Sequence, residues 1–453
     1  MAREPISTSD QAVAFLMSLV RDDPRPYQAR AGRAQMPVRV LLARLGDPHV
    51  DLPVVHIAGS KGKGSTALYL EAILNAAGLS TGTFTSPHLQ RWTERYRVDG
   101  LESTAPEFAA LFAHLQPHVL DLLEEDSASA PSFFDVLTAA AFVLFAETRV
   151  DCAIIETGIG GRLDATNVVQ PMLACITSVE LEHTDKLGTS IAAIAGEKAG
   201  IIKKGVPLVI GPLPGEAESV IRDRARSLAT TVSALEQEIA LDTHAGPGGG
   251  LVIQVLDDHR EYRAVLPGPV SDCNARNAAL AIACAHRVAG RGERRLEAAV
   301  TRALADTRLP GRMEVVGEHP WVVIDGAHTP ASTRALAEML KCLPARRMHL
   351  IVSLSVARDA AAVLAPLLER AHRVVITNAD ATRSLDSQRV AADLINHGYP
   401  ASRVATTPDP RKALLETREA LAPHDLLCVA GSMYMAGVAR ETFLGDLAAA
   451  KLL

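Results

Sequence analysis

The sequence predicts two α/β domains, a larger one over residues 1–307 and a smaller one over residues 308–453. The length of 453 residues allows two or three domains at about 150 residues each. Short apolar runs alternate with longer amphipathic stretches, a pattern typical of strand–helix–strand units around parallel sheets. This alternation occurs in two series, separated by a segment of different texture. We place the domain boundary close to Thr307.

The composition narrows the class of protein. Hydrophobic residues make up 48% of the chain and charged residues 22%, which excludes collagen, disorder and a disulfide scaffold. The net charge of −6 gives no electrostatic footprint for general nucleic-acid binding, although it is compatible with a local basic pocket for phosphate. The six cysteines form no Cys-x-x-Cys pair, so we expect neither a zinc site nor a secreted disulfide framework.

The sequence shows no targeting or membrane segment. The N-terminal stretch MAREPISTSD lacks a charged region followed by an apolar one, so no signal peptide is expected. The apolar run at 136–146 is shorter than the ~18 residues that a membrane span needs. We therefore expect a soluble, cytoplasmic protein with no membrane partner.

The first series of apolar runs predicts the strands of the larger domain. Helical periodicity lies between these runs, for example over 66–77 and 134–146. The expected strands are LPVVHIA (52–58), VDCAIIE (150–156), LACITSV (173–179) and PLVIG (207–211).

A change of texture follows the first series. The segment 231–269 holds the glycine-rich tip AGPGGG and alternating stretches such as LVIQVLDD, which predict a small antiparallel insert or edge. A helix over 275–287 comes next. The second series then predicts the strands WVVID (321–325), MHLIVSL (348–354), RVVIT (373–377) and LLCVAGS (426–432).

The segment HIAGSKGKGST (56–66) is the strongest local signal. Its glycines follow an apolar strand and open a helix, so backbone N–H groups and the helix N-terminus could cradle phosphate oxygens. Lys63 would reach the β- and γ-phosphates, and Ser65 or Thr66 could offer a hydroxyl. The spacing departs from G-x-x-x-x-G-K-[ST], because Gly64 separates Lys63 from Ser65. A tight strand-to-helix turn without nucleotide is the alternative.

Polar side chains follow the next two strands. Glu156 ends one strand and is a candidate Mg²⁺ ligand, since parallel sheets place ligands at the carboxyl ends of their strands. His183 follows the third strand in ELEHTDKLG. A solvated strand-end carboxylate and a structural histidine are the alternatives. Glu197 and Lys198 lie in a helical stretch, where an exposed charge pair is the simplest interpretation.

Six ordered segments resemble those of the folylpolyglutamate synthases and dihydrofolate synthases, members of the Mur ligase superfamily. The resemblance covers nearly the whole chain and implies an ATP-dependent amide ligase. It implies a P-loop-containing parallel-sheet ATPase domain followed by a smaller Rossmann-like α/β domain. The segments are HIAGSKGKGST, TSPHL (85–89), ETGIGGRLDATN (156–167), EHTDKLGTSIAAIAGEKAGIIK (182–203), LPGRMEV (309–315) and IDGAHTPAS (324–332).

The resemblance also implies roles for individual residues. Catalytic roles fall to Lys63, Lys198, His183 and Arg312. ATP would contact Lys61, Gly62, Lys63, Gly64, Ser65, Asn277, Arg312 and Asp325, and so would lie between the domains. Two Mg²⁺ ions would be held by Ser86, Glu156, His183 and Lys198, a lysine that is commonly carbamylated in the family. Pterin-side contacts would come from Ser132, Phe133, Phe134, Asp135, Leu163, Asp164 and Ala165.

The implied chemistry activates a carboxylate that an amine cannot attack directly. Transfer of the γ-phosphoryl group of ATP gives an acyl phosphate, which the amine of L-glutamate then attacks. The acid would be dihydropteroate, a tetrahydrofolate, or both. Domain closure would exclude water from the acyl phosphate. The resemblance implies small-molecule partners and a monomer.

Some positions depart from the family pattern. Ser60 and Lys61 replace the more frequent Thr-Asn, and Glu182 replaces an Asp before His183. The second domain has SVARD, with Arg358 and Asp359, where Asp-Lys-Asp is usual. These departures bear most on the amino-acid acceptor. The alternatives are a ligase for another acid such as a cell-wall precursor, a P-loop NTPase switch or transporter module, and a non-catalytic homologue.

Overall fold

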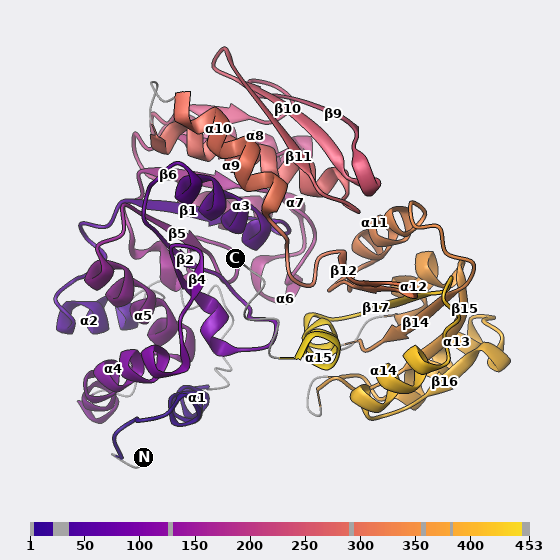
Figure 1. Cartoon of the computed structure of the whole chain (residues 1–453). Helices are drawn as coiled ribbons and strands as arrows, with labels where there is room; N and C mark the ends of the chain where they lie inside the picture. The colour runs from indigo at the N-terminus through magenta and orange to yellow at the C-terminus, as the bar shows by residue number, and fades with distance from the viewer. Residues whose placement is uncertain are drawn as a thin grey trace.

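Helices and strands alternate along the chain, as Figure 1 shows for this computed structural model. The structure describes residues 4–20, 36–125, 130–289, 294–354, 359–380 and 384–445. The helices are α1 Ser9–Ser18, α2 Met36–Arg44, α3 Lys63–Ala76, α4 Ala105–Glu125, α5 Phe133–Thr148, α6 Thr184–Leu187, α7 Ile191–Lys198, α8 Gly215–Ser227, α9 Asp272–Ala289, α10 Arg294–Asp306, α11 Pro330–Leu340, α12 Ala360–Leu368, α13 Ser387–Asn396, α14 Pro410–Glu419 and α15 Met433–Leu444.

The strands form three sheets. The first holds β1 Val54–Ala58, β2 Thr81–Phe84, β3 Tyr96–Val98, β4 Leu101–Glu102, β5 Cys152–Glu156, β6 Leu173–Ile176, β7 Leu208–Ile210 and β8 Val232–Ala234. The second holds β9 Ala240–Ala245, β10 Leu251–Asp257 and β11 Arg260–Leu266. The third holds β12 Glu314–Glu318, β13 Trp321–Ile324, β14 Met348–Val352, β15 Ala371–Ile376, β16 Val404–Thr406 and β17 Leu426–Ala430.

The first sheet has the order β4-β3-β2-β5-β1-β6-β7-β8. Its strands pair in parallel from β2 to β8, whereas the β4-β3-β2 edge is antiparallel. Strands β1 and β5 are buried along their whole length, which explains their continuous apolar sequences. Because β5, β1 and β6 are adjacent, the residues after them meet at one edge of the sheet.

The third sheet has the order β12-β13-β17-β14-β15-β16 and is parallel from β13 to β16. Strand β12 runs antiparallel to β13 at its edge. Together the sheets confirm the predicted fold class, a parallel-sheet α/β domain followed by a smaller α/β domain. The segment 231–269 contains the three-stranded antiparallel sheet, as expected.

The cores follow the layers of the fold. Helices α1, α2, α4 and α5 pack on one face of the first sheet. Helices α3, α9 and α10 cover the other face together with the antiparallel sheet, which lies at the top of Figure 1. Helix α15 lies between the two halves of the molecule in that view. Among the residues described, no helix is both long enough and apolar enough to cross a membrane.

Candidate active site

The phosphate loop joins β1 to α3, as the sequence predicts. Gly62 is the N-cap of α3 and has a φ of 85°, in the left-handed region that favours glycine. A Cβ at Gly62 would lie 2.3 Å from Oδ1 of Asn277. Glycine is therefore required twice here, for its conformation and for the close approach of α9. The contact places Asn277, a predicted nucleotide contact, directly against the loop.

Two side chains after β6 hold the loop in place. The carbonyl oxygen of Lys61 accepts hydrogen bonds from Oγ1 of Thr177 at 2.6 Å and from Oγ of Ser178 at 3.1 Å. The Lys61 amide donates in turn to Oγ of Ser178 at 2.8 Å. The sequence analysis missed both residues, although they lie within LACITSV, the strand expected beside β1. Together with the Ser60 amide, which donates to the Ser178 carbonyl at 2.9 Å, these bonds fix the start of the loop against the residues after β6.

Lys63 and Glu156 lie together at the start of α3. The Lys63 ammonium donates to the carbonyl of Gly59 at 3.0 Å and lies 4.0 Å from Oε1 of Glu156. The amide of Ser86 donates to Oε2 of the same carboxylate at 2.9 Å. Burial raises the pKa of Glu156, and Lys63 acts against that shift. A Cβ at Gly64 would lie 3.3 Å from the carboxylate, so the loop and Glu156 share one space.

Lys198 is fully buried and does not form the exposed charge pair with Glu197 that is the simplest interpretation of its sequence. Its ammonium donates to Oε1 of Glu182 at 2.9 Å, and Lys61 lies 4.0 Å from the other carboxylate oxygen. Burial lowers the pKa of Lys198 to about 8, against the raising effect of Glu182. Glu197 instead pairs with Arg162 at 2.7 Å. Lys198 therefore points toward the phosphate loop.

His183 and Ser65 lie at the same edge of the sheet. His183 is exposed and is the N-cap of the short helix α6. Its φ of 45° lies in the left-handed region. Ser65 lies in the first turn of α3 and is half-buried. Lys63 is among the charges that act on His183. Glu182, the residue before His183, lies 4.0 Å from the Lys61 ammonium, so His183 directly follows a residue that faces the loop.

Arg312 and Asp325 bring the second half of the chain to the site. The Asp325 carboxylate, at the end of β13, accepts the amides of Met313 and Ala327, each at 2.7 Å. Burial raises the pKa of Asp325, and Arg312 acts against that shift. Arg312 also lowers the pKa of Glu156, in the other sheet. Its exposed guanidinium thus acts on carboxylates from both halves of the molecule.

The predicted pterin-side residues form one cluster beside Glu156. Ser132 caps α5, and its hydroxyl donates to the Asp135 carboxylate at 2.6 Å. A Cβ at Gly158 would lie 2.6 Å from the Phe134 ring and 3.2 Å from the Asp164 carboxylate. Phe133 packs edge-on against Trp92. The remaining two, the half-buried Leu163 and the buried Ala165, flank Asp164 in the chain.

Asp164 organises the loop that carries it. Its carboxylate accepts the amides of Gly158 and Ile159 at 3.0 Å and the hydroxyl of Thr166 at 2.5 Å. His56, on β1, lies 2.9 Å from that hydroxyl through Nε2. Because the Thr166 proton goes to Asp164, Nε2 of His56 must be the donor. Burial lowers the pKa of His56 to about 3, which keeps the ring neutral.

The side chains near the phosphate loop fit a divalent cation that is also bound by phosphate. Within the described ranges, no three His, Cys, Asp or Glu side chains come together in a group that could hold a metal ion. Glu156 is nevertheless a buried carboxylate beside Ser86 and the phosphate loop. Mg²⁺ takes one or two carboxylates and completes its shell with phosphate oxygens and water. The residues therefore fit an ion that arrives with a phosphate.

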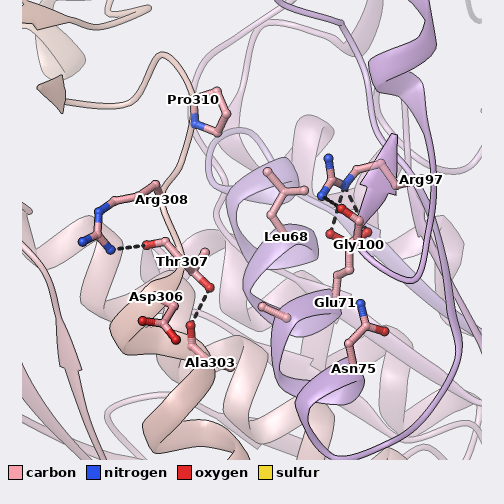
Figure 2. A pocket seen from close by; sticks show the side chains of 11 residues that line it. Leu68, Glu71, Asn75, Arg97, Gly100, Ala303, Asp306, Thr307, Arg308 and Pro310 are labelled. Carbon is pink, nitrogen blue, oxygen red and sulfur yellow. Dashed lines mark hydrogen bonds and ion pairs between the residues drawn. The ribbon is translucent and has the colours of Figure 1, made fainter. Parts of the chain in front are cut away.

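A separate cavity of about 250 Å³ lies along the C-terminal part of α3 (Figure 2). Leu68, Asn75 and Gly100 line it on one side, and residues 306–308 line it on the other. Inside it, Arg97 pairs with Glu71 at 2.9 Å. None of the predicted site residues lines this cavity, so it does not belong to the site at the loop.

The chain is similar to known proteins over most of its length. The family model "Mur ligase, glutamate ligase domain" matches residues 311–433. A dihydrofolate synthase/folylpolyglutamate synthase of Bacillus subtilis is 33% identical over 88% of this chain and 92% of its own length. The corresponding protein of Mycobacterium tuberculosis is 33% identical over 97% of this chain and 96% of its own length.

Solved structures match over the same extent. Mycobacterium tuberculosis folylpolyglutamate synthase complexed with ADP aligns with a TM-score of 0.86 at 32% identity and covers 96% of this chain and 98% of its own. A folylpolyglutamate synthase in complex with AMPPCP and folate aligns with a TM-score of 0.80 at 27% identity, over 96% of this chain and all of its own. The chain belongs to the folylpolyglutamate synthase/dihydrofolate synthase family of Mur ligases.

Proposed function

We propose that this protein is an ATP-dependent ligase that joins L-glutamate to a folate substrate through an acyl phosphate. The observation that carries the proposal is the phosphate loop, with Lys63 4.0 Å from a buried Glu156 and with Arg312 acting on that carboxylate from the second half of the chain. ATP analogues and folate are bound in the solved relatives. A non-folate acid is not favoured, because the curated relatives are folylpolyglutamate and dihydrofolate synthases.

The nucleotide would lie on the loop and reach into the second domain. Residues 61–65 would hold its phosphates, and Asn277, Arg312 and Asp325 would make further contacts. Thr177 and Ser178 support this assignment because they already bond the Lys61 backbone, which fixes the loop before any ligand binds. A preformed cradle lowers the entropy cost of binding the triphosphate.

The reaction proceeds in two steps, phosphoryl transfer and then attack by the amine. A substrate carboxylate oxygen bonds to the γ-phosphorus, and the bond from that phosphorus to its bridging oxygen breaks, which releases ADP. The neutral amine of glutamate then bonds to the acyl carbon, phosphate leaves with its oxygen, and the amine loses a proton. Lys63 and Arg312 would stabilise the charge on the phosphoryl group in the first step. Closure of the domains would exclude water from the acyl phosphate.

The metal assignments extend the same proposal. Ser86, Glu156 and His183 would hold one Mg²⁺, and Lys198 would help to hold a second after reaction with carbon dioxide, a step in which its neutral amine forms a carbamate and releases a proton. Mg²⁺ would neutralise phosphate charge and polarise the transferring group. Carbamylation requires Lys198 to leave its ion pair with Glu182. The full burial of Lys198 and its pKa, lowered to about 8, support this assignment, because they increase the share of neutral amine.

The folate would bind along the cluster that follows Glu156. Phe133, Phe134, Leu163 and Ala165 offer apolar surface for a pterin ring, and Ser132, Asp135 and Asp164 offer polar groups around it. The cluster is continuous with Glu156 through Gly158, which contacts both Phe134 and Asp164. That continuity would bring the glutamate end of a folate to the phosphate loop.

The deciding experiment incubates the purified protein with ATP, Mg²⁺ and L-glutamate, plus dihydropteroate or tetrahydrofolate in separate reactions. Mass spectrometry then looks for products heavier by one glutamate residue. Phosphate release that requires both acid and glutamate is the expected result. Phosphate release without acid or amine would instead identify an NTPase. The separate reactions distinguish the two synthase activities of the family.

We also propose a domain boundary near Thr307 and a monomeric state. Helix α10 ends at Asp306 and β12 begins at Glu314, which leaves a short connection between them. Light scattering of the eluting protein tests the monomer, and limited proteolysis tests the boundary.

The second domain departs from the family pattern at Arg358 and Asp359. Arg358 lies outside the described residues, and the Asp359 carboxylate accepts the amide of Ala362 and so caps α12.

A further inference from the structure

A segment of the first domain is inserted into the second. Leu89 follows Ser86 in the loop after β2, yet only 9% of its surface is exposed. It packs in a core cluster whose other buried members all come from the second domain, among them Ile324 of β13 and Ala436 of α15. The segment 86–90 therefore has one end in each half of the molecule.

The contact with α15 is too close for any side chain at Gly437. A Cβ at that position would lie 2.0 Å from the carbonyl oxygen of Leu89. The next nearest atoms are the Leu89 carbonyl carbon, at 3.0 Å, and the Gln90 amide nitrogen, at 3.7 Å. Glycine inside a helix is less favourable than alanine. This unfavourable glycine lies at the point where the segment 86–90 crosses α15.

A buried arginine secures the same crossing. Arg440, one turn further along α15, is 5% exposed, and its Nη1 donates to Oε1 of Gln90 at 2.6 Å. Its Nε donates to the Glu314 carboxylate at 2.7 Å. That carboxylate also accepts the amide of Gly311 at 2.7 Å. Arg440 thus links the segment to the first strand of the second domain and to the connection before it.

The segment is stiff enough to transmit a displacement. The carboxylate of Glu94 accepts the amides of Leu89, Gln90 and Arg91 at 2.7–2.9 Å, which fixes their backbone. Three residues before Leu89, the Ser86 amide donates to Glu156 at 2.9 Å. Two residues, Pro87 and His88, separate Ser86 from this fixed stretch, and His88 is itself held by Nε of Arg95, which donates to its Nδ1 at 3.0 Å.

We propose that Gly437 and Arg440 of α15 are positioning residues that hold Ser86 against Glu156 from the other domain. We call these two residues and their contacts with Leu89 and Gln90 the α15 clamp. The clamp makes the geometry at Glu156 depend on how the domains are packed. The role of the clamp in catalysis rests on the proposed function, whereas its contacts exist in the protein without any substrate.

The test measures hydrogen exchange of the Ser86 amide in the full-length protein without nucleotide or metal. Gly437→Ala improves helix propensity, and the three atoms nearest its Cβ belong to Leu89 and Gln90 of the first domain, so we expect the second domain to stay folded. We expect at least tenfold faster exchange in the peptide that contains Ser86, with exchange in α11 and β14 unchanged. Gly215→Ala in α8 is the matched control, because nothing lies within 4 Å of a Cβ there.

A second pair of variants keeps the test decisive if Gly437→Ala fails to fold. Gln90→Ala and Arg440→Lys each remove the bond between these side chains, and Arg440→Lys keeps a charge beside Glu314. Each should speed Ser86 exchange, and the double variant should add little, because both remove one interaction. Parent-like exchange in the Gly437→Ala protein, or independent effects of the two substitutions, would overturn the clamp.

Two further readouts separate positioning from loss of structure and from failure of the proposed function. ADP binding without Mg²⁺ should stay within twofold of the parent, because the phosphate loop is held by Thr177 and Ser178 and not by the clamp. A misfolded variant would lose ADP binding as well. Exchange is measured without substrates, so a protein that does not ligate glutamate could still show the clamp, and an active ligase could still lack it.

Discussion

Lys63 is held by acceptors that a triphosphate would replace. Its ammonium donates to the Gly59 carbonyl and faces the Glu156 carboxylate, and these two acceptors lie beside the phosphate loop. The long side chain is therefore directed to the place where the γ-phosphate would lie. Lysine acts on phosphate as a point charge, so loss of that charge affects phosphoryl transfer more than folding.

We expect Lys63→Ala to lower kcat at least 100-fold, the usual scale for removal of a group that stabilises transition-state charge. The melting temperature is measured alongside, because the variant also removes the charge that lies 4.0 Å from the buried Glu156 carboxylate. Glutamate-dependent phosphate release measures the effect. Lys412→Ala, at an exposed pair with Glu416, is the control for the loss of a lysine. A near-normal rate in the Lys63 variant would remove Lys63 from the mechanism.

Lys198 supports a prediction of chemical rescue. Lys198→Ala should lose most activity, and acetate should restore part of it, because a small carboxylate can occupy the space of a carbamate. The rescue is measured as the rate at increasing acetate concentration, with chloride at equal ionic strength as control. Full activity without acetate would make Lys198 a structural partner of Glu182.

Asp135 makes stability depend on pH. Burial raises its pKa to about 6, although Ser132 acts in the opposite direction. In the unfolded chain the value is about 3.9, so between these values the folded state binds more protons and stability falls as pH rises. Asp135→Asn should remove this fall, which is at most about 3 kcal/mol. Urea unfolding of both proteins from pH 4 to 7 measures it, and a constant difference would contradict the prediction.

At the scale of elements, α3 is tied to the sheet edge by a buried ion pair. Arg97 on β3 bonds Glu71 through Nε at 2.9 Å, and both side chains are buried beside the cavity of Figure 2. Removal of one partner leaves a buried charge without compensation. Because α3 carries the phosphate loop, the pair fixes that helix at its far end.

Glu71→Ala should lower the free energy of unfolding by about 3–5 kcal/mol, the cost of breaking a buried pair from one side. Glu338→Ala, which breaks the exposed pair with Lys341, should cost less than about 1 kcal/mol. Urea denaturation compares the two. Equal losses would show that the buried pair contributes no more than the surface pair.

The strands that carry the site were predictable because they are buried on both faces. The runs at 52–58 and 150–156 contain β1 and β5, and the run at 173–179 contains β6. The antiparallel edge β4-β3-β2 was not expected, since its strands are two to four residues long and lack a clear period. The partner of Lys198 was also missed, because Glu182 lies 16 residues away and only the turn at His183 brings them together.

At the scale of the whole molecule, the sequence could not predict how the two halves meet. Leu89 is an ordinary apolar residue in TSPHL, and nothing in the segment indicates that it completes a core on the other side of the connection. Gly437 likewise has, in the sequence, only the character of a residue that disfavours a helix. Such contacts depend on the relative placement of domains, which local patterns do not encode.

The last prediction concerns nucleotide binding across both domains. A non-hydrolysable ATP analogue should raise the melting temperature of the parent, because a ligand that binds only the folded state stabilises it. Arg312→Ala should reduce the affinity about 10- to 100-fold, since a hydrogen bond to a charged group contributes about 1.5–3 kcal/mol. Arg308→Ala is the matched control, because its guanidinium bonds the carbonyls of Ala305 and Thr307 at the end of α10. Equal temperature shifts in both variants would mean that the nucleotide makes no contact with Arg312, and Asp325 would then be the one proposed nucleotide contact left in the second domain.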